Sequence, residues 1–262
     1  MRTLQRTFLY AMTVLLLAVS QVACTSTRLP PYEATYTTKL RGIKIKGVRK
    51  FESLGENNYR ISWTAKALWM QLNEWSDFEI VDKKVRPVSY HYTRKGLGTD
   101  RPVHVYFDWA SMRASGAKGD NTYEYELLPG VLDKLSYQVQ MQLDLLANPR
   151  QRALSYTIAN YSGLRDYRFD YTATETIDTR LGPRETLVYQ REKKDSTIRL
   201  WIAPVQNYLP VKIEQEEDGD SNVVLIKSWE SHSIAPQAQL SSRSRATDPA
   251  GPAAGEPFDD DF

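Results

Sequence analysis

The sequence predicts a mainly β protein of the α+β class, in which a curved antiparallel sheet or open half-barrel of about ten to twelve strands packs on one long amphipathic helix. Three observations predict this fold. Apolar and polar residues alternate with a period of two along most of the chain. One segment instead repeats its apolar residues at steps of three and four. The 262 residues include 16 tyrosines and 6 tryptophans, whose rings suit the pleated surface of a sheet.

The first residues predict export from the cytoplasm. Arg2 and Arg6 precede the apolar residues 8–19, which read FLYAMTVLLLAV. A charged start followed by about twelve apolar residues is typical of a signal peptide, whereas a membrane-spanning helix needs roughly twenty. We therefore expect a signal peptide over residues 1–23, a short linker over 24–31, and a periplasmic protein.

The only cysteine, Cys24, lies at the end of this segment in SQVACTS. This position resembles the lipobox of bacterial lipoproteins, in which a cysteine after small residues is acylated and becomes the first residue of the mature chain. Ala23 fits that pattern, whereas Gln21 replaces the large aliphatic residue usual three positions before the cysteine. The resemblance implies a lipid anchor at Cys24, and Thr25 after it implies the outer membrane. Ordinary cleavage near residues 18–20, which leaves a free thiol, stays open as the alternative.

The first half of the body consists of alternating runs. They cover residues 32–40, 43–46 and 59–66, with shorter runs at 78–82, 88–94, 103–109 and 122–127. Breaks that contain glycine, asparagine or aspartate separate several of them, such as residues 55–58 and 116–121. Such alternation predicts antiparallel strands with one buried face and one solvated face.

One segment between the two halves predicts a helix. Its apolar residues recur at helical spacing: Val131, Leu132, Leu135, Val139, Leu143 and Leu146. Glutamines and aspartates fall on the opposite side, and Asn148 followed by Pro149 predicts the end of the helix. A helix on a membrane surface would be enriched in lysine and arginine on its polar face, and this segment lacks that enrichment. We therefore expect a core helix on the concave face of the sheet.

The second half predicts further strands and then a tail. In residues 201–219, WIAPVQNYLPVKIEQEEDG, we expect one face to carry Ile202, Leu209, Val211 and Ile213, and the other Trp201, Tyr208, Lys212 and Glu214. Strands on both sides of the helix give one half-barrel domain over residues 32–234. Residues 235–262 are rich in proline, alanine, serine and aspartate, and we expect a disordered acidic tail. We interpret its end, FDDDF, as solvated rather than as a docking peptide.

The second half resembles a family of bacterial periplasmic proteins, the domain of unknown function 3108. The resemblance rests on the helix LDKLSYQVQMQLDLL and, most specifically, on residues 167–219 with their LGP turn, polar turn and AP–YLPVKIE hairpin. It extends loosely over residues 32–230, including the hairpin near residues 42–47. The family implies an architecture similar to the LolA/LolB-like lipoprotein carriers, a curved half-barrel around helices that often holds an acyl chain. It implies no catalytic residues.

The sequence contains little that points to catalysis, metal binding or nucleic acid. A net charge of +2 gives no strong field to attract nucleic acid. His91, His104 and His232 have no metal-ligand spacing to one another, so we expect strand residues rather than ligands. The chain has no G-x-S-x-G elbow, Walker loop or H-E-x-x-H motif. We therefore expect a protein that is not an enzyme and needs no cofactor.

Two features suit binding. Aromatic residues together with two apolar helix residues are candidates for lining a hydrophobic cavity under the sheet: Tyr36, Trp63, Trp69, Tyr106, Trp109, Leu135 and Val139. The alternative is that the rings fill a closed core. The basic residues 39–50, KLRGIKIKGVRK, suit anionic head groups, and here the alternative is a solvated strand face.

The leading hypothesis is an exported, non-enzymatic envelope protein that binds or carries a lipid or another hydrophobic ligand. The second is an envelope scaffold that holds a protein partner. The third is a hydrolase of an envelope polymer, which would need a polar cleft with shifted carboxylate pKa values. The space between the helix near Val139 and the sheet distinguishes them, since an open apolar groove favours a carrier and a filled one favours a scaffold.

Overall fold

A computed structural model describes residues 29–40, 42–68, 70–96, 102–193, 196–217 and 220–232. The expected signal peptide, Cys24, the candidate Trp69 and the expected tail over residues 235–262 lie outside these ranges. Within them no helix is long and apolar enough to cross a membrane.

The described chain forms one antiparallel sheet of fourteen strands. Their bounds are β1 Tyr32–Leu40, β2 Ile43–Gly55, β3 Asn58–Ala67, β4 Met70–Val81, β5 Lys84–Lys95, β6 Val103–Asp108, β7 Arg113–Lys118, β8 Asn121–Glu126, β9 Ala153–Asn160, β10 Gly163–Thr179, β11 Gly182–Lys193, β12 Ser196–Ala203, β13 Leu209–Glu217 and β14 Asp220–Ser231. The mainly β class is confirmed, but the expected ten to twelve strands are too few. β4 reads MQLNEWSDFEIV, in which apolar and polar residues alternate only weakly. The pattern therefore predicts only the end of this strand.

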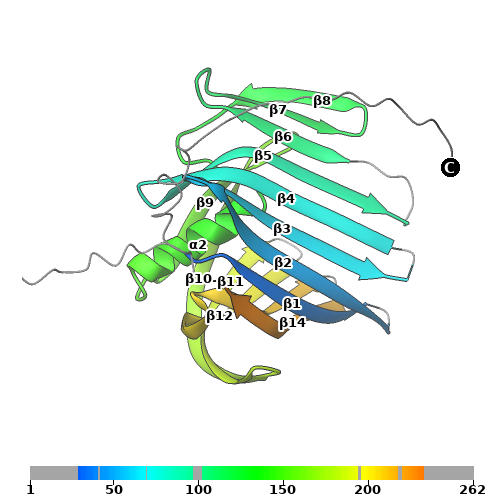
Figure 1. The fold of residues 1–262 in the computed structure, drawn as a ribbon, viewed down its shortest axis with the longest axis vertical. Helices are drawn as coiled ribbons and strands as arrows, with labels where there is room; N and C mark the ends of the chain where they lie inside the picture. The colour runs from blue at the N-terminus through cyan, green and yellow to red at the C-terminus, as the bar shows by residue number, and fades with distance from the viewer. Residues whose placement is uncertain are drawn as a thin grey trace, which may run out of the picture. The chain divides into compact units, whose positions relative to one another are not determined.

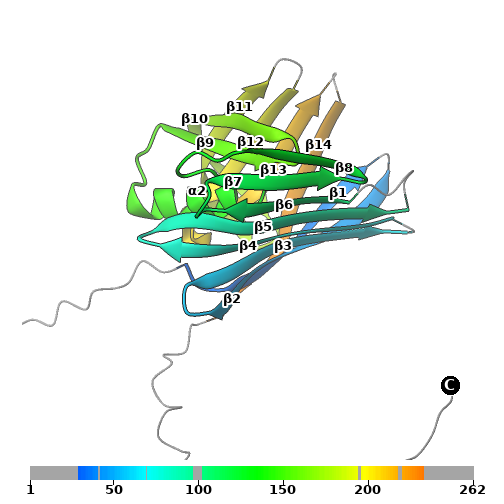
Figure 2. The same cartoon turned by 90° about the horizontal axis from the view of Figure 1, so that it is seen from above.

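The strand order joins two meanders into one sheet. It runs β8-β7-β6-β5-β4-β3-β2-β1-β14-β13-β12-β11-β10-β9. Within the first meander, β1 to β8, and the second, β9 to β14, each strand pairs with the next one in the chain; β1 also pairs with β14, whereas β8 and β9 do not pair. Figures 1 and 2 show the first meander, in blue and green, beside the second, in yellow and orange. The two free edges of the sheet are therefore β8 and β9.

These two edges approach each other without forming a ladder. The Tyr125 hydroxyl on β8 donates a hydrogen bond of 2.5 Å to the carbonyl of Asn160 on β9. Leu132, which follows β8 in the chain, forms an isolated parallel bridge with Ile158 of β9. The sheet is therefore an open barrel whose gap is spanned by single contacts.

The helix α2, Ser136–Ala147, begins later than the apolar pattern predicts. Val131 and Leu132 are buried in the segment before it rather than in the helix. Asp133 forces this start, because its carboxylate accepts hydrogen bonds from the backbone N–H groups of Leu135 (2.8 Å) and Ser136 (2.9 Å). The helix ends before Asn148, as predicted.

The helix is also buried more completely than an amphipathic pattern predicts. Gln140 and Gln142, expected on a polar outer side, are 4% and 1% exposed. The Gln140 side chain accepts a hydrogen bond of 2.7 Å from the backbone N–H of Val85, and the Gln142 side chain donates one of 2.9 Å to the carbonyl of Asn207. Buried amides must be paired in this way, so the glutamines fix α2 against both meanders.

Under the helix the inner face of the sheet is filled by stacked rings. Phe51, Tyr59 and Phe78 come from β2, β3 and β4, and their ring centroids are 5.3 to 6.3 Å apart. All three are 1–2% exposed. Figures 1 and 2 place α2 at this end of the strands, where the turns β2–β3 and β4–β5 lie.

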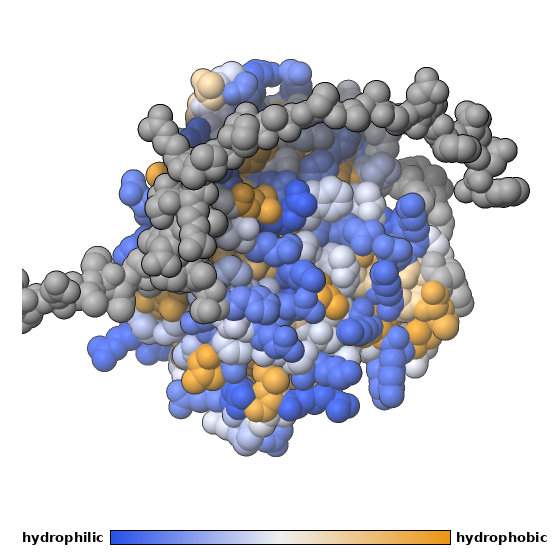
Figure 3. Space-filling model, in the orientation of Figure 1, coloured by the Kyte–Doolittle hydropathy of each residue, from blue (hydrophilic) through white to orange (hydrophobic). Residues whose placement is uncertain are grey.

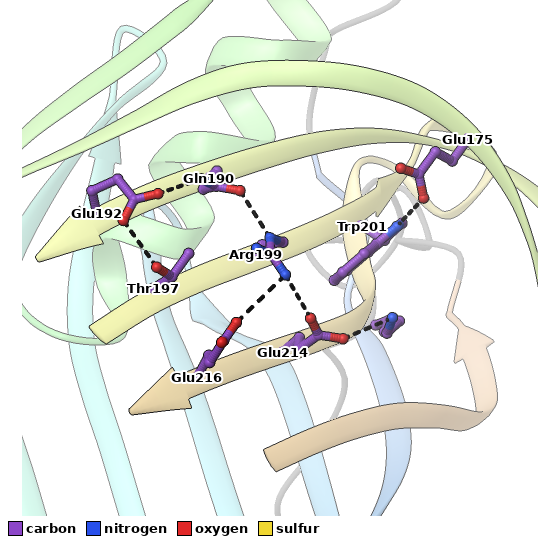
Figure 4. Close-up of polar contacts among 9 residues, drawn as sticks. Glu175, Gln190, Glu192, Thr197, Arg199, Trp201, Glu214 and Glu216 are labelled. Atoms are coloured by element: carbon purple, nitrogen blue, oxygen red, sulfur yellow. Dashed lines mark hydrogen bonds and ion pairs between the residues drawn. The ribbon is translucent and has the colours of Figure 1, made fainter. Parts of the chain in front are cut away.

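The outer face of the second meander is polar, but a register shift between Trp201 and Ile202 interrupts the expected division of residues 201–219, because it places Pro210 opposite Ile202 and Leu209 opposite Ala203. Gln190, Arg199 and Glu214 lie opposite one another on β11, β12 and β13, and Arg199 bonds both of the others (Figure 4). Trp201 donates a hydrogen bond of 2.7 Å to Glu175, and the Lys212 ammonium lies 3.7 Å from its ring centroid. The surface seen in Figure 3 is mostly hydrophilic, with hydrophobic residues in small separate groups.

Tyr208 is an exception to that division. It was expected on the outer face of a strand, but it lies in the turn between the 3-10 helix Pro204–Gln206 and β13. Asn207 and Tyr208 both adopt left-handed backbone conformations, with φ of 52° and 58°. The turn thus interrupts the alternation at this residue, and Tyr208 is 9% exposed.

Candidate ligand-binding cavity

One row of inward residues crosses the first meander. Each residue stands directly opposite the next on the neighbouring strand, from β2 to β7: Arg49, Trp63, Glu74, Tyr92, Val103 and Lys118. Because neighbouring residues in such a row are about 5 Å apart, the side chains form a continuous belt on the inner face. The belt combines charged, aromatic and aliphatic groups, unlike the ring stack under α2.

A cavity of about 580 Å³ lies over this belt. Its lining consists of Glu74, Tyr90, Tyr92, Arg94, Val103, Lys118, Lys134 and Tyr161. Strands β4 to β7 form its floor, Lys134 reaches it from the segment before α2, and Tyr161 from the turn between β9 and β10. The exposure of Arg94 and Lys134 leaves the cavity open to solvent on one side.

Gly116 on β7 allows Tyr161 to reach the cavity. A Cβ atom at Gly116 would overlap the backbone carbonyl of Tyr161, so only glycine permits the β9–β10 turn to approach this closely. The Lys118 ammonium lies 5.0 Å from the centroid of the Tyr161 ring. The free edges of the sheet therefore meet at the cavity wall.

Glu74 is the acidic group of the lining. The Tyr90 hydroxyl donates a hydrogen bond of 2.5 Å to its carboxylate. Burial raises the pKa of Glu74, although the Tyr90 hydrogen bond and the Lys134 charge oppose that rise. Burial therefore disfavours the charged form of the acid in this lining.

Three cations share the lining with Glu74. Among the described residues, Arg94, Lys118 and Lys134 form no ion pair with a carboxylate. The cavity therefore has an excess of positive charge beside three tyrosines. This combination suits an anionic group attached to a flat or apolar body.

Two buried arginines lie outside the lining, Arg49 in the belt and Arg191 on β11. Arg49 is 3% exposed, donates a hydrogen bond to the Gln138 side chain, and leaves its Nε without a partner. Arg191 is 8% exposed, and its guanidinium lies 3.6 Å from the centroid of the Tyr167 ring. Neither forms an ion pair with a carboxylate in the described chain, and a buried charge without a counterion is costly.

Asp133, the other buried acid near the cavity, has a structural role. Besides the two backbone bonds at the start of α2, its carboxylate accepts a hydrogen bond of 2.6 Å from the Ser76 hydroxyl. Burial raises the pKa of this carboxyl, while these hydrogen bonds lower it. With both oxygens engaged, Asp133 holds the helix against β4.

The predicted lining residues are divided between the core and the surface. Tyr36 and Trp63 pack on the inner face with ring centroids 5.4 Å apart, and Leu135 and Val139 are fully packed beside the sheet. The space next to Val139 is thus filled, and the open space lies beyond the start of α2.

The expectation for Tyr106 requires correction. This residue is 48% exposed, because Val105 and Phe107 take the inward positions of β6. Tyr106 lies on the outer face, where its ring is 5.5 Å from that of His91 and 5.4 Å from that of His104. His91 and His104 stand opposite each other there, but the described ranges hold no group of three or more histidine, cysteine or acidic residues fit to bind a metal.

Trp109 lines a different hollow, of about 680 Å³, near the end of the barrel that α2 covers. Its indole donates a hydrogen bond of 2.7 Å to the carbonyl of Pro87, and the Arg86 guanidinium lies 5.4 Å from its ring. The ring is therefore held by its own neighbours rather than turned into the cavity over the belt.

Sequence reasoning missed the polar residues of the cavity. Glu74, Lys118 and Lys134 appear in the sequence as ordinary charges, and Tyr161 as a turn residue. Strand register is what brings these residues together. It places Glu74, for example, between Trp63 and Tyr92 on the neighbouring strands. No pattern within a single strand contains that information.

Comparison with known proteins gives a family and a fold. Residues 32–227 match the family model described as "Protein of unknown function (DUF3108)". The structure is similar to a β-barrel-like protein of the domain of unknown function DUF1849 from Brucella abortus, with a TM-score of 0.54 and 10% sequence identity over 78% of this chain and 99% of that one. At this identity the likeness concerns the fold alone, and no curated protein matches the sequence. Because the family model spans well over half of the sequence, the chain belongs to the DUF3108 family of proteins of unknown function.

Proposed function

We propose that this protein is a non-enzymatic binding protein of the bacterial envelope, which holds an amphiphilic ligand with an anionic group in the cavity over the belt. One observation carries the proposal: cations without carboxylate partners and tyrosine faces line an open cavity on the inner face of the barrel. Its volume of about 580 Å³ lies within the usual range of small-molecule sites, roughly 300–1,000 Å³.

The chemistry of the lining supports two contacts with such a ligand. The anionic group meets Lys118, Lys134 and Arg94, which are free to form charge-assisted hydrogen bonds. The apolar part lies on Tyr92 and Val103, which stand opposite each other on β5 and β6 in the lining. A purely hydrocarbon ligand would leave the cations unpaired, so this lining corrects the expected apolar groove toward an amphiphile.

The location of the protein belongs to the same proposal. The charged and apolar start of the sequence supports export to the periplasm, and Cys24 supports a lipid anchor at the outer membrane. An anchored protein would meet amphiphiles at the membrane surface. The LolA/LolB-like resemblance supports this role, since carriers of that kind have an open barrel around helices.

A fluorescent long-chain carboxylate and its uncharged methyl ester test the proposal on the full chain. We expect the acid to bind and the ester to bind about tenfold more weakly, as for the loss of one charge-assisted hydrogen bond. Lys134→Gln should weaken binding of the acid by a similar factor, because it removes a cation from the lining. Lys83→Gln is the matched control, since Lys83 is exposed in the β4–β5 turn and is not in the lining.

Equal affinity for acid and ester, or equal loss in both variants, would contradict the anionic preference. Native mass spectrometry of protein purified from membranes identifies a natural ligand. In-cell crosslinking addresses the scaffold hypothesis, because a scaffold traps one defined protein and a carrier traps lipid.

A hydrolase is the second candidate, and Glu74 is the observation that favours it. A carboxyl with a raised pKa in an open cavity is typical of an acid catalyst. Glycosidases, however, use two carboxyl groups, and Glu74 is the one acid among the lining residues that the structure describes. Asp133 is engaged by Ser76 and the start of α2. Glu74→Gln separates the two functions, because it abolishes hydrolysis but preserves the cations that bind the ligand.

A further inference from the structure

A second hollow, on another part of the sheet, carries four cations. Its volume is about 570 Å³, and its lining consists of Thr37, Thr38, Lys39, Lys44, Arg180, Ser221, Val223 and Lys227. We call it the basic groove. It shares no residue with the cavity over the belt.

Two distant parts of the chain build the basic groove. Strands β1, β2 and β14 are neighbours in the sheet and supply the lysines, and the turn between β10 and β11 supplies Arg180. Figure 1 shows the end of the β10–β11 hairpin as a curved ribbon below β12 and β14. The long strand β10, of 17 residues, gives the hairpin the reach to bring Arg180 to this side of the sheet.

The charges of the basic groove are unbalanced. Its lining contains no carboxylate, and within the described residues Lys39, Lys44, Lys227 and Arg180 form no ion pair. Lys39 and Lys44 stand directly opposite each other on β1 and β2. Like charges in that position repel each other and destabilise a strand pair, and a bound anion would remove this repulsion.

The pattern continues along β2. Lys46, two residues after Lys44, stands opposite Lys66 of β3. Successive like-charge pairs extend the positive field on this side of the sheet, which attracts anions to the groove. An ordinary solvated strand face would place acidic residues opposite these lysines.

The other lining groups suit oxygen-rich anions. Thr37, Thr38 and Ser221 bring hydroxyl donors between the cations. Arginine recognises phosphate with two parallel N–H donors, and lysine binds it as a point charge. Three lysines, one arginine and three hydroxyls therefore match the several oxygens and the double charge of a phosphate monoester or a diphosphate.

We propose that the basic groove binds a phosphate group, carried either by an envelope lipid head group or by a small soluble phosphate. The proposal does not rest on the cavity over the belt, because the two sites share no residue. Occupation of the groove relieves the repulsion between Lys39 and Lys44, so the bound form is the more stable one.

Calorimetric titration of the full chain with inorganic phosphate and pyrophosphate tests the site. Pyrophosphate should bind more tightly and raise Tm, and both effects should weaken as the salt concentration rises. Lys44→Gln and Arg180→Gln should each reduce affinity about tenfold, whereas Lys83→Gln, outside the groove, should leave it unchanged. No binding of either anion, or an equal loss in Lys83→Gln, would overturn the proposal.

The two sources of phosphate are separated with vesicles. Binding to phosphatidic acid vesicles but not to phosphatidylcholine vesicles, lost in Lys44→Gln and Arg180→Gln, assigns the groove to a lipid head group. Binding of pyrophosphate alone assigns it to a soluble phosphate. Vesicle binding that Lys83→Gln weakens as much as Lys44→Gln contradicts a defined site.

A measurement without ligand completes the test. If Lys39 and Lys44 repel each other, Lys44→Gln should raise Tm of the ligand-free protein by about 1–3 °C. The further rise in Tm that pyrophosphate gives should be smaller in this variant than in the unmodified protein. A fall in Tm would show that the lysines are already compensated, and it would overturn the argument from like charges.

Discussion

The two ends of the barrel interior differ in what fills them. Under α2, inward positions of β2, β3 and β4 carry Phe51, Tyr59 and Phe78, which stack into a solid core. Further along the same sheet the inward positions carry charges, as at Arg49 on β2 and Glu74 on β4, and the space is open. The alternation of faces is the same at both ends.

This difference shows that burial pattern and chemistry are separate properties of a strand. On β4 the inward series changes from Phe78 through Ser76 to Glu74 within five residues of sequence. A period of two decides which residues point inward, and the identity of those residues decides whether the inside becomes core or cavity. One continuous sheet thereby provides both a rigid end and a site.

The largest expected contrast comes from removing one ring at each end. Phe78→Ala should lower the free energy of unfolding by about 3–5 kcal/mol, because it leaves a void in a packed stack. Tyr92→Ala, at the open end, should cost about 1 kcal/mol, because solvent fills the enlarged cavity. Chemical denaturation measures both, and equal losses would mean that the open end is packed as tightly as the end under α2.

Gly116→Ala tests whether the open end depends on close approach of the two sheet edges. The added methyl group overlaps the backbone of Tyr161, so the β9–β10 turn must move and the cavity wall with it. We expect a loss of about 1–3 kcal/mol in unfolding free energy together with weaker ligand binding. Ser115→Ala is the control, because Ser115 is exposed on the other face and should change stability by less than about 0.5 kcal/mol.

The pH dependence of stability should differ between the protein and its Glu74→Gln variant. Because burial raises the pKa of Glu74, the folded state keeps a proton that the unfolded state releases above the ordinary pKa of 4.5. This contribution is present below that pH and is lost as pH rises through the raised pKa. The variant should therefore lose less stability with rising pH.

Denaturation curves from pH 4 upward, compared between the two proteins, measure this difference. The pKa of Asp133 is also raised by burial, and both proteins retain that group, so the difference between them reports Glu74 together with its charge interaction with Asp133. Parallel stability profiles would mean that Glu74 titrates as a solvated acid, contrary to its position in the belt.

The smallest expected effect on stability is that of Lys134→Gln. Lys134 is exposed and forms no ion pair in the part of the chain described, so the free energy of unfolding should change by less than about 0.5 kcal/mol. Affinity for the fluorescent carboxylate should nevertheless fall. A large loss of stability would instead assign Lys134 to the scaffold of the barrel.

The sequence predicted the elements well where alternation was clean. On β3, Tyr59, Ile61 and Ala65 are buried and Lys66 is exposed, as the period of two requires. Alternation fails at bulges, which no single-strand pattern announces: the register shifts between Thr35 and Tyr36 and between Asp77 and Phe78.

The site was less predictable than the fold for two physical reasons. The belt depends on how six strands align, and register is a property of pairs rather than of one segment. The helical pattern places Gln140 and Gln142 on the polar side of α2, yet both side chains are buried. They are buried because they pair with the backbone N–H of Val85 and the backbone carbonyl of Asn207, one from each meander. Aromatic content alone did not distinguish Tyr36, which is buried, from Tyr106, which is exposed.

The pairing of β1 with β14 also determines when the sheet can be completed during synthesis of the chain. The first strand of the sheet keeps one side of its backbone unpaired until the last strand has been synthesised, because no other strand occupies that position. Contacts of such long sequence separation form slowly, and an unpaired strand edge invites association with other chains. A nascent chain that lacks β14 therefore presents an open β edge along β1, and residues Asp220–Ser231 complete the sheet.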